Sequence, residues 1–179
     1  CFGDLGVKWQ KDPSWEKTDM NWFVTPWALR EVLLYVHATY APPCGIVVTE
    51  NGCAYEPRDS LALDTLPGAL VPKRYDPASG PLEDLPGETF DDPQRVRFLR
   101  LHLRAVHEAV SSGADVRGYF VWSLFDNFEW SEGYTKRFGI VRVDYATQKR
   151  TIKGSGRFYA DVVKGHGLHA EADDKEPAY

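Results

Sequence analysis

Two runs of consecutive apolar residues, separated by a helical pattern, constrain the fold of this chain more than any other feature. They occupy residues 45–49 and 116–123. Neither run alternates apolar with polar side chains, and such continuous runs are typical of strands that are buried on both faces of a parallel sheet. Two strands of this kind joined by a helix form a right-handed parallel βαβ unit, so the sequence predicts a fold of the α/β class.

Proline, glycine and capping residues predict where the helices begin and end. Thr25, which precedes a proline, predicts a capped helix start, and Pro42 predicts the end of that helix. Asp92, also before a proline, predicts a second start, and Gly113 the corresponding end. A third helix is expected over residues 155–164. The apolar stripes expected on the first two helices are Leu29, Val32, Leu33, Val36 and Tyr40, and Val96, Leu99, Leu103, Val106 and Val110.

The remaining segments define the expected limits of the domain. Residues 53–90 are rich in proline, glycine and acidic residues, which predicts a long functional loop. Residues 138–144 alternate apolar with polar side chains and predict a short strand with one solvated face. We expect residues 1–165 to form one domain, and residues 166–179 to form a charged tail whose composition predicts disorder.

The stretch VVTENG, residues 47–52, has two interpretations. An Asn-Gly pair between β-prone residues is the strongest short-range signal of a hairpin. In a parallel arrangement, Glu50 instead lies at the C-terminal end of a strand, which is the edge where parallel α/β folds bind ligands. The helical pattern between the two apolar runs favours this second interpretation.

Composition and charge exclude several classes of partner and cofactor. The net charge is −5 and no cluster of lysine and arginine is present, which argues against a nucleic-acid partner. No apolar run is long enough for a transmembrane helix, and no signal peptide or lipidation motif is visible. The three cysteines are too sparse for a disulfide framework, and no spacing of cysteine and histidine suits zinc, so we expect neither metal nor cofactor. His102 and His107 are expected to be packing or surface residues.

A cluster of aromatic and acidic residues follows the second apolar run. It consists of Trp122, Asp126, Asn127, Glu129 and Trp130. Tryptophan can stack on the apolar face of a sugar ring while carboxylate and amide groups bind the sugar hydroxyls. The alternative is a packed aromatic loop with solvated acids, and composition alone favours it, because most aromatic side chains belong to cores.

Three separated motifs together resemble a known family. VVTENG, GYFVWSLFDNFEWSEGYTKRFGIVRVDY and KRTIKGS occur in the order found in the C-terminal part of glycoside hydrolase family 1, the β-glucosidase family. This resemblance covers most of residues 18–163 and implies a (β/α)8 TIM barrel that hydrolyses β-glycosides with retention. It also implies roles for individual residues: Glu50 as nucleophile, Trp122 as the platform under the sugar, Glu129 as acceptor for two sugar hydroxyls, Trp130 as donor to a third, and Phe138 as an aromatic wall.

Two departures from the family limit what this chain is expected to do. A retaining glycosidase needs a nucleophilic carboxylate and a second, protonated carboxyl group as general acid. The resemblance implies that this acid is the glutamate of an Asn-Glu-Pro motif, and the chain contains no such motif. A complete barrel also needs about 250 residues, whereas this chain has 179. We therefore expect a C-terminal fragment with about the last two barrel strands and their helices, inactive on its own.

The expected substrate is a neutral β-glucoside or β-galactoside, as a small molecule or an oligosaccharide. Family branches that accept 6-phosphorylated sugars carry serine, lysine and tyrosine where this chain has Glu129, Lys136 and Phe138. Only the lysine matches, and a carboxylate at 129 would repel a phosphate. Two other interpretations stay open: a non-catalytic sugar-binding or interaction module, and a truncated chain that does not fold alone. The oligomeric state and the compartment are left open.

Overall fold

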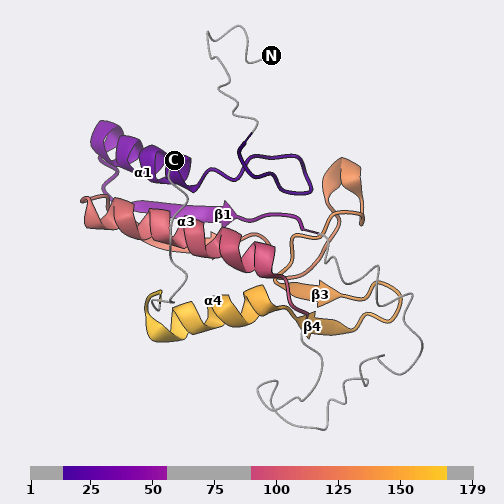
Figure 1. Ribbon diagram of the computed structural model, residues 1–179. Coiled ribbons are helices and arrows are strands. Elements are labelled where there is room, and N and C mark those ends of the chain that lie inside the picture. The colour runs from indigo at the N-terminus through magenta and orange to yellow at the C-terminus, as the bar shows by residue number, and fades with distance from the viewer. Residues whose placement is uncertain (1–13, 56–89, 169–179) are drawn as a thin grey trace, which may run out of the picture.

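The computed structural model of the protein describes residues 14–55 and 90–168 (Figure 1). Most of the expected charged tail and most of the expected long loop lie outside these ranges. The described elements are α1 (Pro26–Tyr40), β1 (Ile46–Asn51), α3 (Pro93–Ser111), β2 (Val116–Val121), the 3-10 helix η4 (Trp130–Glu132), β3 (Val141–Val143), β4 (Arg150–Ile152) and α4 (Gly154–Gly165).

Strands β1 and β2 pair in parallel, as the two apolar runs predict. Val47 lies opposite Gly118, Val48 opposite Tyr119, and Asn51 opposite Val121. Because α3 connects the two strands, β1, α3 and β2 form the expected βαβ unit. The hairpin interpretation of Asn51 and Gly52 is therefore wrong: β1 extends to Asn51 and finds its partner strand beyond a helix.

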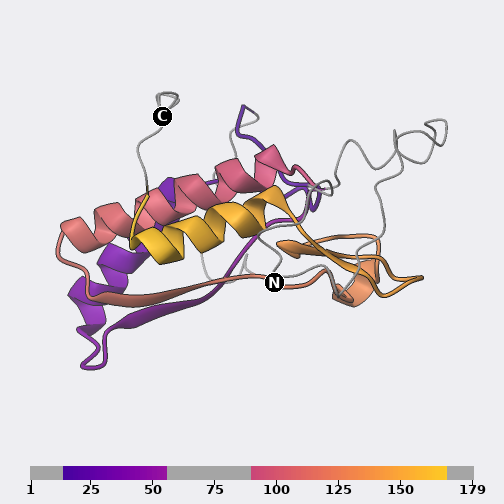
Figure 2. The same ribbon diagram turned by 90° about the horizontal axis from the view of Figure 1, so that it is seen from below.

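The helices cover one face of this parallel pair, as Figure 2 shows for α3 and α4. Ile46 and Val48 pack on this face against the buried Leu33 of α1 and Ala109 of α3. Val47 points to the opposite face, where it is 46% exposed. Phe120 lies on that same face, with a ring atom 3.7 Å from the point where a Cβ on Gly118 would lie, and it is 59% exposed.

A second core lies beyond the C-terminal end of the sheet. It combines the loop after β1, the first turns of α3, and β3. Its buried members are Val24, Cys53, Tyr55, Phe98, Leu99, Ile140 and Val141, with Phe158 and Tyr159 of α4 packed against them. This core therefore joins the segments that follow both parallel strands to one another.

Several local predictions need correction. Thr25 and Asp92 occupy the N-cap positions, but neither side chain makes a capping hydrogen bond. The predicted stripes also include residues that are not buried. Val32 of α1 is 56% exposed, and Val110 of α3 is 44% exposed. Since α3 contacts α1, α4 and β2, it buries a wider face than a single stripe. The buried residues of α3 are Arg95, Phe98, Leu99, His102, Ala105 and Ala109.

The C-terminal part matches the prediction with one addition. The strand expected over 138–144 is shorter, Val141–Val143, and it pairs antiparallel with Arg150–Ile152, a strand that the sequence pattern did not indicate. The last helix is confirmed as Gly154–Gly165. Within residues 14–55 and 90–168, no helix has both the length and the apolarity needed to cross a membrane.

Candidate active site

The C-terminal ends of β1 and β2 meet at a backbone hydrogen bond. The amide of Trp122 donates to the carbonyl oxygen of Asn51 at 2.9 Å. Glu50 precedes Asn51 at the end of β1, and its side chain is exposed. The structure thus brings Glu50 and Trp122 to neighbouring positions on the edge of the sheet where ligands bind in parallel α/β folds.

A partly buried tyrosine of β2 holds the residue after Glu50. The hydroxyl of Tyr119 donates to the side-chain oxygen of Asn51 at 2.6 Å, and the carbonyl oxygen of Tyr119 accepts a hydrogen bond from the Tyr159 hydroxyl at 3.0 Å. Burial raises the pKa of Tyr119, so its hydroxyl keeps its proton and remains a donor. The Asn51 amide is therefore oriented by the neighbouring strand.

Phe138 lies next to the segment that follows β2. It is buried, and its carbonyl oxygen accepts a hydrogen bond from the amide of Ser123 at 3.2 Å. Its ring centroid is 5.9 Å from that of Trp22, which is 51% exposed. The sequence reasoning did not single out Trp22, whose exposed indole lies next to the expected site residue Phe138. Asn21, directly before it, has a φ of 60°, and an asparagine in this left-handed conformation could have indicated a turn that presents the indole.

Glu129 and Trp130 lie on a separate turn around η4. Glu129 is buried, and its amide donates to the carbonyl oxygen of Gly133 at 2.6 Å. Trp130 is 82% exposed. No hydrogen bond or ion pair within the described residues joins Glu129 or Trp130 to Glu50. The structure therefore brings Glu50, Trp122 and Phe138 into one connected region and presents the other pair from an adjacent loop.

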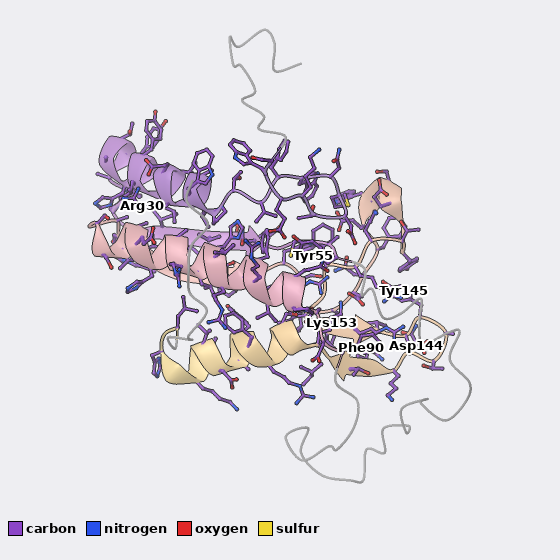
Figure 3. The ribbon with its side chains drawn as sticks, viewed as in Figure 1. Arg30, Tyr55, Phe90, Asp144, Tyr145 and Lys153 are labelled. Atoms are coloured by element: carbon purple, nitrogen blue, oxygen red, sulfur yellow. The ribbon has the colours of Figure 1, made fainter. Side chains whose placement is uncertain are left out.

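A buried group of charges lies beneath these loops. Nζ of Lys153 is 2.8 Å from Oδ1 of Asp126, and neither side chain has any exposed surface. Figure 3 shows Lys153 beside Phe90, near the N-terminal end of α3. Burial, together with the charge of Arg95, lowers the pKa of Lys153 to about 8. Sequence reasoning missed this group, because lysine and arginine are almost never fully buried unless they are paired.

His102 and His107 are not arranged as metal ligands. His102 is buried, stacks on Phe98 with ring centroids 3.9 Å apart, and its Nδ1 lies 2.8 Å from the Phe98 carbonyl oxygen. His107 is exposed on the same helix. In the part of the chain that the structure describes, no group of three or more His, Cys, Asp or Glu residues could hold a metal ion.

Comparisons with known proteins find one family. The family model described as "Glycosyl hydrolase family 1" matches residues 3–65 and 79–168. The chain is 40% identical to Beta-glucosidase A of Thermotoga maritima over 152 residues, which cover 85% of this chain and 28% of that protein. It is 36% identical to a 6-phospho-beta-galactosidase of Lacticaseibacillus rhamnosus over 90% of this chain and 30% of that protein.

Solved structures show the same partial correspondence. The family 1 β-glucosidase from Thermotoga maritima is similar with a TM-score of 0.69 and 38% identity, over 89% of this chain and 30% of that one. The complex of the same enzyme with glucoimidazole also has a TM-score of 0.69, and the match covers 90% of this chain and 30% of that one. The chain therefore spans less than a third of the length of these relatives.

Proposed function

The chain belongs to glycosyl hydrolase family 1, and on this basis we propose that it forms the nucleophile-bearing part of a retaining β-glycosidase. Its βαβ unit is the C-terminal part of a (β/α)8 barrel. The described residues form two two-stranded sheets and no closed barrel. The observation that carries the proposal is the position of Glu50, exposed at the C-terminal end of β1, next to Asn51, which is hydrogen-bonded to the residue that follows β2, Trp122.

Glu50 would act by double displacement. Its carboxylate attacks the anomeric carbon, the bond to the leaving oxygen breaks, and a covalent glycosyl-enzyme forms, which water then hydrolyses. Trp122 would lie under the sugar ring, and the buried Phe138 would close one side of the pocket. Glu129 would accept hydrogen bonds from two sugar hydroxyls, and the indole N–H of Trp130 would donate to a third.

The chain supplies one of the two carboxyl groups that this mechanism needs. No Asn-Glu-Pro motif is present in its sequence. Without a general acid, attack by Glu50 must expel the leaving oxygen unprotonated, as an alkoxide or an aryloxide, and general acid–base catalysis typically contributes about 10²–10⁴-fold to the rate. We therefore expect the 179-residue chain by itself to be inactive on aryl β-glucosides. This missing acid also favours the second candidate function, a non-catalytic sugar-binding module.

The proposed substrate is a neutral β-glucoside or β-galactoside. Glu129 is buried, so a sugar phosphate next to its carboxylate would meet like charge in a poorly solvated place. Phe138 has no hydroxyl to donate to a phosphate. The similarity to a 6-phospho-beta-galactosidase makes this substrate class the appropriate competitor in an experiment.

A hybrid enzyme tests the proposal. The matching stretch of Beta-glucosidase A of Thermotoga maritima, which aligns over 152 residues, would be replaced by this chain. We expect this hybrid to hydrolyse aryl β-glucosides or β-galactosides with retention, and to prefer them to their 6-phosphates. A folded hybrid that binds glucoimidazole without hydrolysis would instead support the sugar-binding module. A preference for 6-phosphates would refute the proposed substrate class.

A further inference from the structure

We propose that Arg95 and Asp126 form a clamp that positions Phe138 and the segment after Glu50, so that both are positioning residues of the proposed glycosidase site. The inference rests on the proposed function. Neither Arg95 nor Asp126 is assigned a contact with the sugar. Both side chains are buried, with residue exposures of 0% and 4%.

Arg95 lies in the first turn of α3 and joins two loops that are distant in sequence. Its Nη2 donates to the carbonyl oxygen of Tyr55 at 3.1 Å and to that of Arg137 at 2.7 Å. Its Nε donates to the carbonyl oxygen of Cys53 at 3.3 Å. Its Nη1 pairs with Asp92, which keeps the guanidinium in place. Figure 3 shows Tyr55 near the N-terminal end of α3.

Asp126 lies on the segment after β2 and binds the chain on the other side of Phe138. Its Oδ1 accepts a hydrogen bond from the amide of Gly139 at 3.0 Å, and its Oδ2 accepts one from the amide of Val143 at 3.3 Å. The carboxylate is also paired with Arg137 at 2.7 Å and with Lys153 at 2.8 Å. Every described partner of this carboxylate is therefore a hydrogen-bond donor.

Phe138 is thus held on both sides by buried charged groups. The carbonyl oxygen before it, from Arg137, is bound by Arg95, and the amide after it, from Gly139, is bound by Asp126. The same guanidinium binds the loop that begins with Cys53, shortly after Glu50. One connected group of charges therefore sets the relative position of the proposed nucleophile loop and the proposed aromatic wall.

The geometry distinguishes this arrangement from ordinary packing. Buried ion pairs are often no more stabilising than apolar residues of similar volume. A guanidinium, however, offers five donors in a rigid planar fork, which lets Arg95 bind three carbonyl groups from two loops at once. A lysine at this position keeps the charge and can still pair with Asp92, but it cannot reproduce the fork. Arg95→Lys therefore tests positioning with the charge retained.

The first experiment measures hydrogen exchange in the 179-residue chain and in the hybrid. We expect Arg95→Lys and Asp126→Asn to speed exchange of the Gly139 and Val143 amides at least about 10-fold. The matched controls are Arg100→Met and Asp115→Asn. Arg100 lies on the same helix with its guanidinium carbon 4.8 Å from the Phe158 ring centroid, and Asp115 pairs with Arg117 at the other end of the sheet.

The second experiment measures the hybrid enzyme per active site, counted from the burst of aryl alcohol released by a slow covalent substrate. Misplacement of a site by about 1 Å can cost on the order of 10²-fold in rate. We expect Arg95→Lys to lower kcat per counted site by about 10- to 100-fold and to weaken glucoimidazole binding, whereas Arg100→Met changes neither. A purely structural role would instead reduce the number of active sites and leave kcat per site unchanged.

The two measurements separate failure of the clamp from failure of the proposed function. Unchanged exchange at Gly139 in Arg95→Lys would overturn the clamp. Faster exchange with unchanged kcat per site would overturn the positioning role. An inactive parent hybrid would refute the proposed function and with it the catalytic part of this inference, while the exchange data would still decide whether the clamp exists.

Discussion

Gly52 lies so close to the backbone of Trp122 that a Cβ atom on Gly52 would be 1.6 Å from the Trp122 carbonyl oxygen. This contact comes directly after the hydrogen bond from the Trp122 amide to the Asn51 carbonyl oxygen. The presence of glycine after Glu50 and Asn51 is therefore explained without a hairpin. Because it has no Cβ atom, Gly52 lets the segment after β1 approach the end of β2.

Gly52→Ala should disrupt the junction between the two strands. A methyl group there would meet rigid backbone instead of a side chain that can rotate away. Overpacking usually costs about 1–3 kcal/mol and occasionally more, and we expect a cost at or above the upper end of this range. The measurement is denaturant unfolding of the hybrid enzyme. Gly167→Ala is the control, because nothing lies within 4 Å of a Cβ at that position. Equal stability of the two variants would contradict the contact.

Glu50→Ala in the hybrid should lower turnover of an aryl β-glucoside by at least about 10⁴-fold, since the variant lacks the group that attacks the anomeric carbon. Added azide should restore turnover by taking the place of the carboxylate: a carbon–nitrogen bond forms as the bond to the leaving oxygen breaks. The product is then a glycosyl azide of inverted configuration, which chromatography and NMR can identify.

The control for this experiment is Glu108→Ala, which removes a carboxylate from α3 beside Arg30. This variant should retain the activity of the parent and gain nothing from azide. Normal turnover in Glu50→Ala would remove Glu50 from the mechanism. Rescue with a retained configuration would mean that azide does not replace the nucleophile.

The order of the elements could be predicted because local signals coincide with the real boundaries. Pro26 and Pro93 are the first residues of α1 and α3, and a proline at this position loses no helical hydrogen bond. The two apolar runs became β1 and β2, although the helices cover only one face of the pair and leave Val47 and Phe120 exposed on the other. The parallel pairing followed from the helix between them, and it decided against a hairpin at Asn51.

The buried charges could not be predicted, because most of their partners are distant in sequence. Lys153 and Arg95 have no exposed surface, although single-residue tendencies place both residue types outside. Their burial depends on Asp126 and Asp92. Asp92 looked like a cap for α3, but its carboxylate instead accepts hydrogen bonds from the amide and hydroxyl of Ser155 at 2.7 and 2.6 Å.

The uncovered face of the sheet should make the isolated chain bind hydrophobic dyes. Val47 and Phe120 are 46% and 59% exposed on that face. Contiguous exposed apolar surface of this kind marks a place that another element or chain normally covers. We expect the double variant Val47→Thr and Phe120→Thr to bind markedly less dye than the parent chain, as measured by fluorescence.

The control for dye binding is Val163→Thr, because Val163 is 56% exposed but lies on α4, away from the sheet face. This variant should bind as much dye as the parent. A sharp, cooperative thermal transition of a monomeric chain that binds no dye would contradict the expectation.

His102 should make the fold sensitive to acid. Burial lowers the pKa of His102 from 6.5 to about 4. Below pH 6.5 the unfolded chain therefore binds a proton that the folded chain does not. The stability contributed by the neutral imidazole is fully present above pH 6.5 and is lost as the pH falls toward 4. One pKa difference of this size corresponds to about 3 kcal/mol in the free energy of unfolding.

Denaturant unfolding of the hybrid at pH 7 and pH 4 would measure this effect by comparing the parent with His102→Gln. Because glutamine does not titrate, the variant should lose about 3 kcal/mol less between the two pH values than the parent does. His107→Gln is the matched control, since His107 is exposed on the same helix and its replacement should leave the pH dependence unchanged. An equal loss of unfolding free energy in the parent and in His102→Gln would contradict this expectation. It would show that the buried ring, stacked on Phe98, takes up its proton as easily as it does in the unfolded chain.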